Sequence, residues 1–429
     1  MKKLILSVIC IISAVFLYSC VTAGDMNAPD VTEKQTEKQS TSENTQENTE
    51  TNVEDVTQPV GNDKQIVKFA AAGDVLIHGA IYREAEAIAA EKADYSGNYY
   101  FKDMYKGISE LVGQSDIAFA NHEGPIAKTA IAGYPNFNSP SESGDALVEL
   151  GFNVINIANN HMFDVEHKTT GYEDTIEYWD TKEVLQIGGY KNGEDYNKTR
   201  IVEANGIKIA FLAYTYDPYL TNKTSMNSVS KNKGYILPVI NDSVIINQIA
   251  NAKQKADFIV VSVHWGVENT FEPTADQRRV AKLIADNGAN VIIGHHSHTL
   301  QPVEWINGAN GNKTLCVYSL GNLISGMLSS KNMVGGFITF DIVKEDGEAK
   351  IENPVFRPTV CHYNIKDFSK KDVEGNPVRT DFQVYLMEDY TEESAKMHGT
   401  QNYGRFTLDT LKGYVKNEVP VEFLPDYLK

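Results

Sequence analysis

The most informative stretch of the sequence is Asn290-Val291-Ile292-Ile293-Gly294-His295-His296-Ser297-His298. Its residues 291–293 are a short apolar run, which predicts a buried strand. The run ends at a glycine, and three histidines follow within four residues. Proteins with α/β folds place their chemistry at the ends of such strands, and imidazole is the commonest side-chain metal ligand. A surface loop that carries histidines by chance is the alternative, and the pattern around the other strands argues against it.

Apolar runs alternate with amphipathic segments along most of the chain. Strands are predicted at residues 66–72, 116–120, 153–158, 208–214, 257–263 and 314–318, and a hairpin at residues 336–343 and 349–356. Helices are predicted at residues 81–91, 103–112, 145–150, 175–183, 243–256, 274–287, 391–397 and 407–415. This order predicts an α/β fold with one mixed sheet, or two stacked sheets, and helices on the outside.

Polar side chains cluster where several of these strands end. Seven of the ten histidines lie in or just after strand ends: His78, His122, His161, His264, His295, His296 and His298. If the strands lie side by side, the clusters converge on one edge, and Asp74, Glu123 and Asn160 add oxygen ligands. Together these side chains supply enough nitrogen and oxygen ligands to bind two divalent ions. Such ions lower the pKa of water to about 7 and neutralise charge that develops on a phosphoryl or carboxyl oxygen.

Five short motifs in these clusters resemble those of the bacterial capsule-synthesis family called CapA or PgsA. They are Gly73-Asp74, Asn121-His122-Glu123-Gly124-Pro125, Asn159-Asn160-His161, His264-Trp265-Gly266 and Gly294-His295-His296-Ser297-His298. The resemblance extends from about residue 67 to residue 322. That family looks like the calcineurin-type metallophosphoesterases. The resemblance therefore implies a four-layer α/β/β/α sandwich, two divalent metal ions (Mn, Zn or Fe), and a role in capsule or poly-γ-glutamate metabolism.

The resemblance also implies roles for individual residues. The implied metal ligands are Asp74, Glu123, Asn160, His264, His296 and His298. Glu123 stands where phosphoesterases carry the acid that bridges the two ions. His161 matches the histidine that assists the leaving group or orients the substrate. Asp164 is placed to accept a hydrogen bond from His161 and fix its tautomer.

The sequence departs from the phosphoesterase pattern at two positions. The usual Asp-x-His becomes Asp74-Val75-Leu76, so either His78 replaces the missing histidine or one metal has fewer ligands. The usual Gly-His-x-His gains a histidine, His295. Both departures bear on full two-metal phosphatase activity.

Several of the highlighted residues have a purely structural alternative. Asp74 would cap a helix, and Asn160 would serve only in a turn. His122 is expected to be an ordinary packed or loop residue. Trp265 is expected to be a packing residue, and the alternative is a platform on which a carbohydrate or polymer substrate stacks. Glu268 is either a base near the site or a solvated charge. Ser319 and Asn322 either line the site or only form the turn at Gly321.

The first twenty residues are expected to form a targeting segment. Lys2 and Lys3 precede an apolar run at residues 4–17, which is short for a membrane-spanning helix. The following Leu17-Tyr18-Ser19-Cys20 resembles a bacterial lipobox, which implies cleavage before Cys20 and acylation of that residue. An uncleaved anchor and an ordinary secretory signal are the alternatives. All three place the body outside the cytoplasm, and acylation would anchor it to the membrane.

The rest of the chain is divided by composition. Residues 21–64 form a polar linker that cannot build a core, and residues 25–55 carry a net charge of −7. The resemblance implies that residues 65–365 form the capsule-synthesis domain, and residues 366–429 are an extension whose sequence indicates no role. The net charge of −18 argues against a nucleic-acid partner. Cys316 and Cys361 either pair in an oxidising compartment or remain buried thiols.

Two functional hypotheses follow from these observations. In the first, the protein is a lipid-anchored, metal-dependent hydrolase or transferase that acts on a phosphate ester or an envelope polymer. In the second, it is a non-catalytic capsule-assembly protein that retains the fold and binds an anionic polymer. Membrane proteins of capsule synthesis are candidate partners in either case.

Overall fold

The computed structural model describes residues 64–165, 171–216 and 238–429. The predicted targeting segment with Cys20, and residues 21–63 of the predicted linker, lie outside these described residues. Residues Gly61–Lys429 belong to one compact unit. Within the described residues, no helix combines the length and apolar character needed to cross a membrane.

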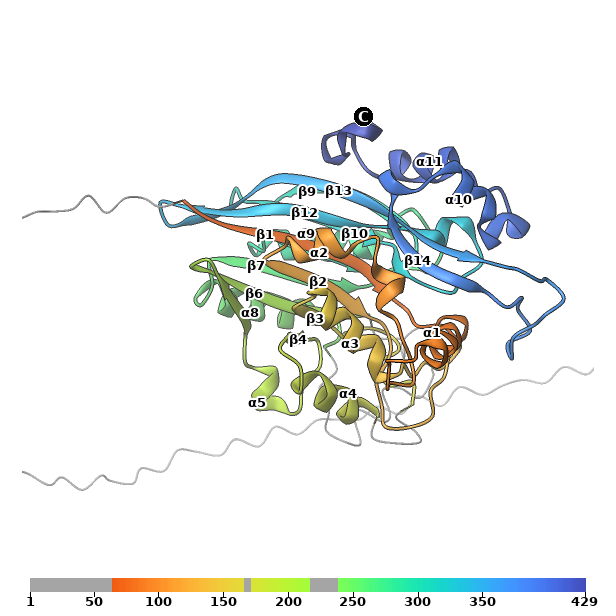
Figure 1. The fold of residues 1–429 in the computed structure, drawn as a ribbon. Helices are drawn as coiled ribbons and strands as arrows, with labels where there is room; N and C mark the ends of the chain where they lie inside the picture. Colours follow the sequence, from red (N-terminus) through yellow and green to blue (C-terminus); the bar gives the residue numbers. More distant parts are fainter. Residues whose placement is uncertain (1–63, 166–170, 217–237) are drawn as a thin grey trace, which may run out of the picture. The chain divides into compact units, whose positions relative to one another are not determined.

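Two β-sheets form the centre of this unit (Figure 1). The larger sheet has the strand order β14-β13-β12-β1-β2-β3-β4, with β11 also paired to β1. Its strands are β1 (Gln65–Val75), β2 (Ile117–His122), β3 (Val154–Asn156), β4 (Leu185–Ile187), β11 (Asn322–Ile324), β12 (Val334–Glu345), β13 (Glu348–Asn364) and β14 (Thr380–Leu386). Strands β1 to β4 are parallel, and β12, β13 and β14 add antiparallel pairs.

The smaller sheet has the order β5-β6-β7-β8-β10-β9. Its strands are β5 (Arg200–Ala204), β6 (Ile207–Thr215), β7 (Phe258–His264), β8 (Val291–His295), β9 (Leu300–Asn307) and β10 (Lys313–Leu320). Strands β6, β7, β8 and β10 run parallel, and β5 and β9 are antiparallel edges. Parallel strands of this kind are buried on both faces, which explains their nearly continuous apolar sequences.

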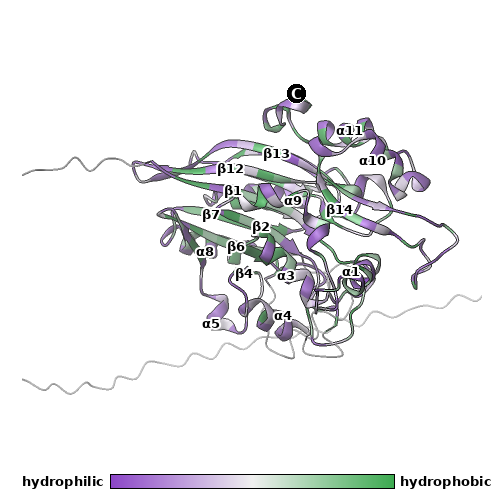
Figure 2. Ribbon diagram, viewed as in Figure 1, coloured by the Kyte–Doolittle hydropathy of each residue, from purple (hydrophilic) through white to green (hydrophobic). Residues whose placement is uncertain are grey.

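The two sheets pack face to face through a shared core. Phe69 of β1 stacks on Phe211 of β6 with ring centroids 6.4 Å apart, and Phe258 of β7 meets Phe340 of β12 at 6.4 Å. Figure 2 shows the hydrophobic residues concentrated in strands such as β1, β2 and β7. Burial of this apolar surface is the main stabilising term for the unit.

Helices cover the outer faces of both sheets. On the smaller sheet, α8 (Asp242–Lys253) and α9 (Ala275–Asp286) bury Ile249 and Ile284 in a second apolar cluster. On the larger sheet, Phe152 follows α3 (Ser141–Leu150) and stacks on Phe337 of β12. The other α-helices of the described residues are α1 (Gly79–Glu91), α2 (Ser109–Gly113), α4 (Gly171–Asp180), α5 (Gly193–Tyr196), α10 (Glu392–Met397) and α11 (Leu408–Glu418). The predicted α/β fold with four layers is confirmed.

The structure differs from the sequence-based expectation in several elements. The helix expected at residues 103–112 is instead the 3-10 helix η1 (Lys102–Tyr105) followed by α2. The break lies at Gly107, which pairs with Tyr385 of β14, and a Cβ atom on Gly107 would lie 2.5 Å from the carbonyl oxygen of Val384. The strands and α-helices of the described residues that were not predicted from sequence are β4, β5, β9, β11, β14 and α5. Strand β14 lies within residues 366–429 and extends the larger sheet.

Candidate metal centre

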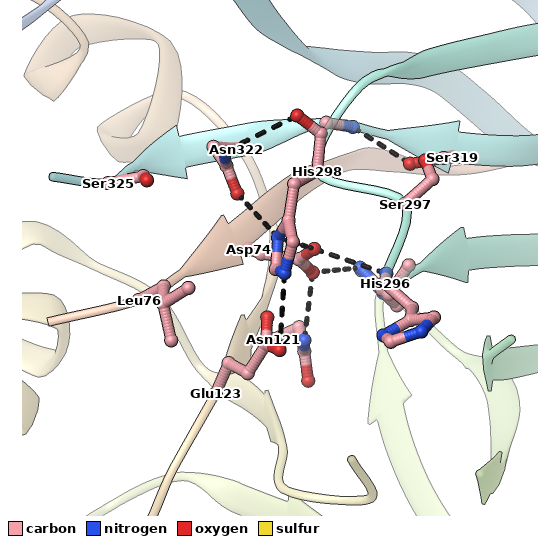
Figure 3. Close-up of polar contacts among 12 residues, drawn as sticks. Asp74, Leu76, Asn121, Glu123, His296, Ser297, His298, Ser319, Asn322 and Ser325 are labelled. Atoms are coloured by element: carbon pink, nitrogen blue, oxygen red, sulfur yellow. Dashed lines mark hydrogen bonds and ion pairs between the residues drawn. The ribbon is translucent and has the colours of Figure 1, made fainter. Parts of the chain in front are cut away.

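The predicted site residues come together where strands of both sheets end. Asp74 of β1 lies opposite Asn121 of β2 and opposite Asn322 of β11. In the smaller sheet, His264 at the end of β7 lies opposite His295 at the end of β8. Both strand registers shift next to Asp74, and such irregularities commonly re-aim a side chain beside a functional site. Figure 3 shows Asp74, Glu123, His296 and His298 gathered in one cluster.

Asp74 is fully buried and accepts hydrogen bonds from three directions. Asn121 Nδ2 donates to Oδ1 at 2.8 Å, His295 Nδ1 lies 2.9 Å from the same oxygen, and the backbone N–H of His296 donates to Oδ2 at 3.2 Å. Burial alone raises the pKa of Asp74, but the hydrogen bonds and charges of His295 and His298 outweigh it and hold that pKa well below its usual value. Asp74 is therefore a carboxylate.

Glu123 is also fully buried, but its carboxyl group has no hydrogen-bond partner on either oxygen among the described residues. Three imidazole nitrogens surround Oε1: His264 Nε2 at 3.6 Å, His298 Nε2 at 3.8 Å and His161 Nε2 at 3.9 Å. Burial, with a contribution from the charge of Asp74, raises the pKa of Glu123 to about 8. A buried carboxyl group that lacks a partner is expensive, so this position is suited to a cation.

The histidines of the cluster differ in protonation. Burial first, and then repulsion from neighbouring imidazoles, lowers the pKa of His296 to about 3 and that of His264 well below its usual value. Both are therefore neutral, as metal ligands must be. Burial lowers the pKa of His298 as well, but Glu123 and Asp74 outweigh it and raise that pKa to about 10. In the metal-free protein, His298 carries the charge that balances the buried acids.

Two overlapping sets of side chains have the spacing of a metal site. One set is Glu123, His296 and His298, and the other is Asp74, Glu123 and His264; in each, the donor atoms lie within 4.8 Å of one another. Both sets share Glu123, the residue expected to bridge two ions. Asn160, a further predicted ligand, places its Oδ1 2.8 Å from His264 Nε2. The six predicted ligands are therefore gathered in one cluster, which is compatible with divalent metal binding.

His161 and Asp164 form a pair at the edge of the cluster. His161 Nδ1 lies 2.7 Å from Asp164 Oδ2, and the backbone N–H of Phe137 donates to the same oxygen at 2.8 Å. Burial lowers the pKa of His161, but the charge of Asp164 outweighs it and raises that pKa. The His161 side chain is 16% exposed, whereas that of Asp164 is 6% exposed. His161 is thus the group of this pair that a substrate can reach.

The two departures from the phosphoesterase pattern have different structural outcomes. His78 belongs to neither donor set, and its Nδ1 accepts the backbone N–H of Gly326 at 3.2 Å. His295 belongs to neither set and contacts Asp74 through Nδ1, while its ring stacks on Phe119 with centroids 5.8 Å apart. The extra histidine therefore orients Asp74.

The observed contacts distinguish the structural and functional interpretations of Asp74, His122 and Trp265. Asp74 lies in β1 and caps no helix. His122 contacts Gly124 O at 3.1 Å and Ser143 Oγ at 3.3 Å, outside both donor sets. Trp265 is buried and donates from Nε1 to Tyr318 O at 3.0 Å, as expected for a packing residue.

The alternatives at Ser319 and Asn322 are also distinguished by their contacts. Ser319 Oγ accepts the backbone N–H of Gly321 at 3.1 Å, so it makes the turn, whereas Asn322 Oδ1 contacts His298 Nδ1 at 3.0 Å and so reaches the cluster. Glu268 is exposed, yet its charge contributes to the raised pKa of Glu123. Cys316 and Cys361 are both free and buried.

Sequence reasoning missed a line of asparagines behind the cluster. Asn156 Nδ2 donates to Asn121 Oδ1 at 2.8 Å, and Asn121 Nδ2 donates in turn to Asp74. Both asparagines are fully buried in strands β2 and β3. A polar residue in a buried strand is the signal that could have identified them, because its amide needs a partner.

Comparisons with known proteins agree with the motif resemblance. Residues 68–327 match the family described as bacterial capsule synthesis protein PGA_cap. The chain is 28% identical over 294 residues to the PGA biosynthesis protein CapA of Bacillus subtilis (strain 168), covering 67% of this chain and 70% of that protein. It is also 28% identical over 291 residues to the capsule biosynthesis protein CapA of Bacillus anthracis, covering 64% of this chain and 65% of that protein.

Two solved structures also show similarity. A hypothetical protein from Thermus thermophilus aligns with a TM-score of 0.40 and 14% identity, covering 67% of this chain and 98% of that one. The calcineurin-like phosphoesterase YfkN from Bacillus subtilis aligns with a TM-score of 0.37 and 13% identity, covering 82% of this chain and 97% of that one.

Proposed function

The chain belongs to the bacterial capsule synthesis protein family PGA_cap, and on that premise we propose that it is a metal-dependent hydrolase of capsule or poly-γ-glutamate metabolism. Its substrate would be a phosphate ester or an envelope polymer. We further propose that it acts outside the cytoplasm, anchored by a lipid on Cys20, where it can meet the polymer and the membrane proteins of capsule synthesis.

The observation that carries the catalytic proposal is the environment of Glu123. Its two carboxyl oxygens are buried and unpartnered among the described residues, yet three imidazole nitrogens lie within 3.9 Å of Oε1. Only a proton or a cation can compensate this carboxyl group. Because burial raises the pKa of Glu123 to about 8, a proton compensates the group at neutral pH when no metal is bound, and a bound cation would displace that proton and compensate the carboxylate instead. The donor set of carboxylates and imidazoles suits transition metals such as Mn, Zn and Fe.

The chemistry of the site can be divided between the ions and the side chains. Bound divalent ions would activate water and stabilise charge on the reacting oxygen. Asp74, Glu123 and the histidines would hold these ions. His161 is oriented by Asp164, whose charge raises the pKa of the imidazole, so a larger share of His161 is protonated than of a free histidine at the same pH. It is therefore suited to donate the Nε2 proton to the departing oxygen, as a general acid does.

The test combines metal analysis with hydrolysis of a generic phosphodiester, bis-(p-nitrophenyl) phosphate, by the purified body. Glu123→Gln preserves the shape of the side chain but removes its charge, and His264→Ala removes one nitrogen donor. Both variants should lose bound metal and activity together. His362→Gln serves as the control, because His362 is a buried histidine that contacts Tyr390 and not the cluster. If Glu123→Gln and His264→Ala retain both metal and turnover, the proposal is wrong.

The non-catalytic alternative gives a different combination of results. A metal-free protein that hydrolyses nothing, but whose loss abolishes the capsule, would support a polymer-binding or assembly role. The anchor is tested separately by Cys20→Ala, which should move the protein from the membrane fraction to the soluble extracytoplasmic fraction. Retention of this variant in the membrane would contradict the lipid anchor.

A further inference from the structure

The turn that carries His296 and His298 has an unusual backbone. The φ angles of these two residues are +92° and +55°. Residues with side chains rarely adopt positive φ, and such conformations persist only when surrounding contacts hold them. The contacts around this turn therefore determine where two of the predicted ligands point.

Asn332 makes one of these contacts. It lies in the 3-10 helix η2 (Ser330–Met333), is 1% exposed, and donates from Nδ2 to the carbonyl oxygen of His298 at 2.9 Å. The same amide donates to Asn269 Oδ1 at 2.8 Å. The backbone N–H of Asn269 in turn donates to the carbonyl oxygen of Ser297 at 2.7 Å. Asn332 and Asn269 together hold two successive carbonyl groups of the turn.

Asn322 connects Asn332 to the imidazole of His298. Its Oδ1 lies 3.0 Å from His298 Nδ1, and its Nδ2 donates to the backbone oxygen of Asn332 at 3.1 Å. Because Nδ1 of His298 is occupied by its contact with Asn322, Nε2 is the nitrogen that faces Glu123, 3.8 Å from Oε1, and a metal ion would bind there in place of its proton. Figure 3 shows Asn322 and Glu123 on opposite sides of the His298 ring. Such partners fix the tautomer and direction of a metal-binding histidine.

Asn332 lies beyond the segment that matches the family, whereas Asn269 lies within it. The family match ends at residue 327, whereas Asn332 follows it. Helix α11, in the C-terminal extension, contacts both supporting segments: the Tyr414 hydroxyl lies 3.0 Å from Ser330 Oγ, and the Tyr414 ring stacks on Phe271 with centroids 5.5 Å apart. Residues beyond the family match, Asn332 and Tyr414, therefore contact the His296–His298 turn or the segments that hold it.

We propose that Asn332 is a positioning residue of the metal centre, which holds the His296–His298 turn so that His298 Nε2 faces Glu123. The proposal rests on the proposed function, because it assumes that the cluster binds metal. Asn332 itself touches neither the predicted ligand nitrogens nor a substrate. Its effect is transmitted through the carbonyl oxygen of His298.

The test uses Co²⁺ as the probe, with its dissociation constant and its visible absorption spectrum as readouts. Asn332→Asp keeps the size of the side chain but removes both amide donors. We expect its Co²⁺ dissociation constant to rise about 10- to 100-fold, as when a hydrogen-bond partner of a metal ligand is removed, and its spectrum to change. The unfolding midpoint of the metal-free protein is measured in parallel.

Asn312→Asp is the matched control. The amide of Asn312 also donates to a backbone carbonyl oxygen, that of Ala285 at 3.0 Å, but it lies before the start of β10, at the end of the strand away from the centre. This substitution should change the Co²⁺ dissociation constant by less than about twofold. If Asn332→Asp does not fold, Asn332→Ser replaces it, because serine removes the donors without adding charge.

The possible outcomes separate this proposal from the proposed function. An unchanged dissociation constant and spectrum in a folded Asn332 variant would overturn the positioning role, even if its unfolding midpoint decreased. Failure of both Asn332 variants to fold, with Asn312→Asp folded, would also overturn it, because Asn332 would then be a structural residue. A wild-type protein that binds no Co²⁺ would instead refute the metal centre, and this proposal with it.

Discussion

His161 Nδ1 lies 2.7 Å from Asp164 Oδ2, and this carboxylate is held in place by the backbone N–H of Phe137 at 2.8 Å. The pair fixes the proton of His161 on Nδ1 and leaves Nε2 directed toward the cluster, 3.9 Å from Glu123. The charge of Asp164 outweighs the effect of burial and raises the pKa of His161. Asp164 therefore influences both the orientation of this imidazole and its protonation.

The first prediction concerns Asp164→Asn. The substitution removes the charge that raises the pKa of His161, so the protonated form needed for acid catalysis is lost at lower pH. We expect kcat for a phosphodiester to decrease about 10- to 100-fold, and the alkaline limb of its pH profile to move to lower pH. Metal content should stay unchanged. An unaltered pH profile would contradict the role of His161 as the acid.

The second prediction concerns protons released by metal binding. Burial raises the pKa of Glu123 to about 8, and Glu123 and Asp74 outweigh burial to raise that of His298 to about 10. Below pH 8 both groups hold protons that a metal must displace. Metal affinity should therefore increase with pH, by about tenfold per pH unit for each proton released.

Calorimetric titrations of Mn²⁺ in two buffers of different ionisation enthalpy measure this release directly. At pH 7 the apparent binding enthalpy should differ between the buffers by an amount equal to the protons released multiplied by the difference in ionisation enthalpy. Identical enthalpies in both buffers would show that neither Glu123 nor His298 changes protonation.

The site was predictable where its residues sit directly after an apolar run. Residues 291–293 predict a strand, and the three histidines that follow mark its end, so local sequence is sufficient. The same holds for Asp74 and for His264. The resemblance to the capsule-synthesis family rests on these local motifs and is confirmed by the family match.

The remaining features depend on contacts that no local pattern encodes. Asn332 contacts the carbonyl oxygen of His298 from 34 positions away, and nothing in its neighbouring sequence marks it. Strand β14 alternates buried Phe382 and Val384 with polar residues inside a polar tail, so its hydrophobic signal is weak. Its pairing with β13 supplies the stability that its sequence does not reveal.

The third prediction concerns His398, which links the C-terminal extension to β13. Its Nε2 donates to Cys361 O at 3.0 Å, and its Nδ1 accepts the backbone N–H of Thr400 at 3.0 Å. The bond accepted by Nδ1 needs the neutral ring, and burial lowers the pKa of His398 from 6.5 to about 3. The unfolded chain gains a proton near pH 6.5 and the folded protein does not, so stability is lost as pH falls below 6.5.

Urea unfolding at pH 7 and pH 5 measures this loss. His398→Asn retains a donor and an acceptor but cannot titrate. Wild type should lose about 2 kcal/mol more than His398→Asn between the two pH values. Equal losses in the two proteins would show that His398 does not remain neutral in the folded state.

The fourth prediction concerns Leu76, which stands where phosphoesterases usually carry a histidine. Leu76 directly follows the end of β1 and lies two positions after Asp74, so a side chain at position 76 starts from the strand end that carries Asp74. Leu76 is buried, and its backbone N–H donates to Ile324 O at 3.0 Å, a bond that any residue except proline can keep. Leu76→His should therefore add an imidazole to the donor set without breaking the backbone connection.

If wild type binds one ion tightly and a second weakly, Leu76→His should tighten the weaker site and raise the metal content per chain toward two. Equilibrium dialysis against Mn²⁺, with elemental analysis, measures both quantities. Leu76→Asn is the control, because it introduces a polar side chain of similar size that lacks the imidazole. A metal content equal to that of wild type in a folded Leu76→His protein would show that position 76 does not reach the centre. The lost histidine would then have no bearing on how many ions this chain holds.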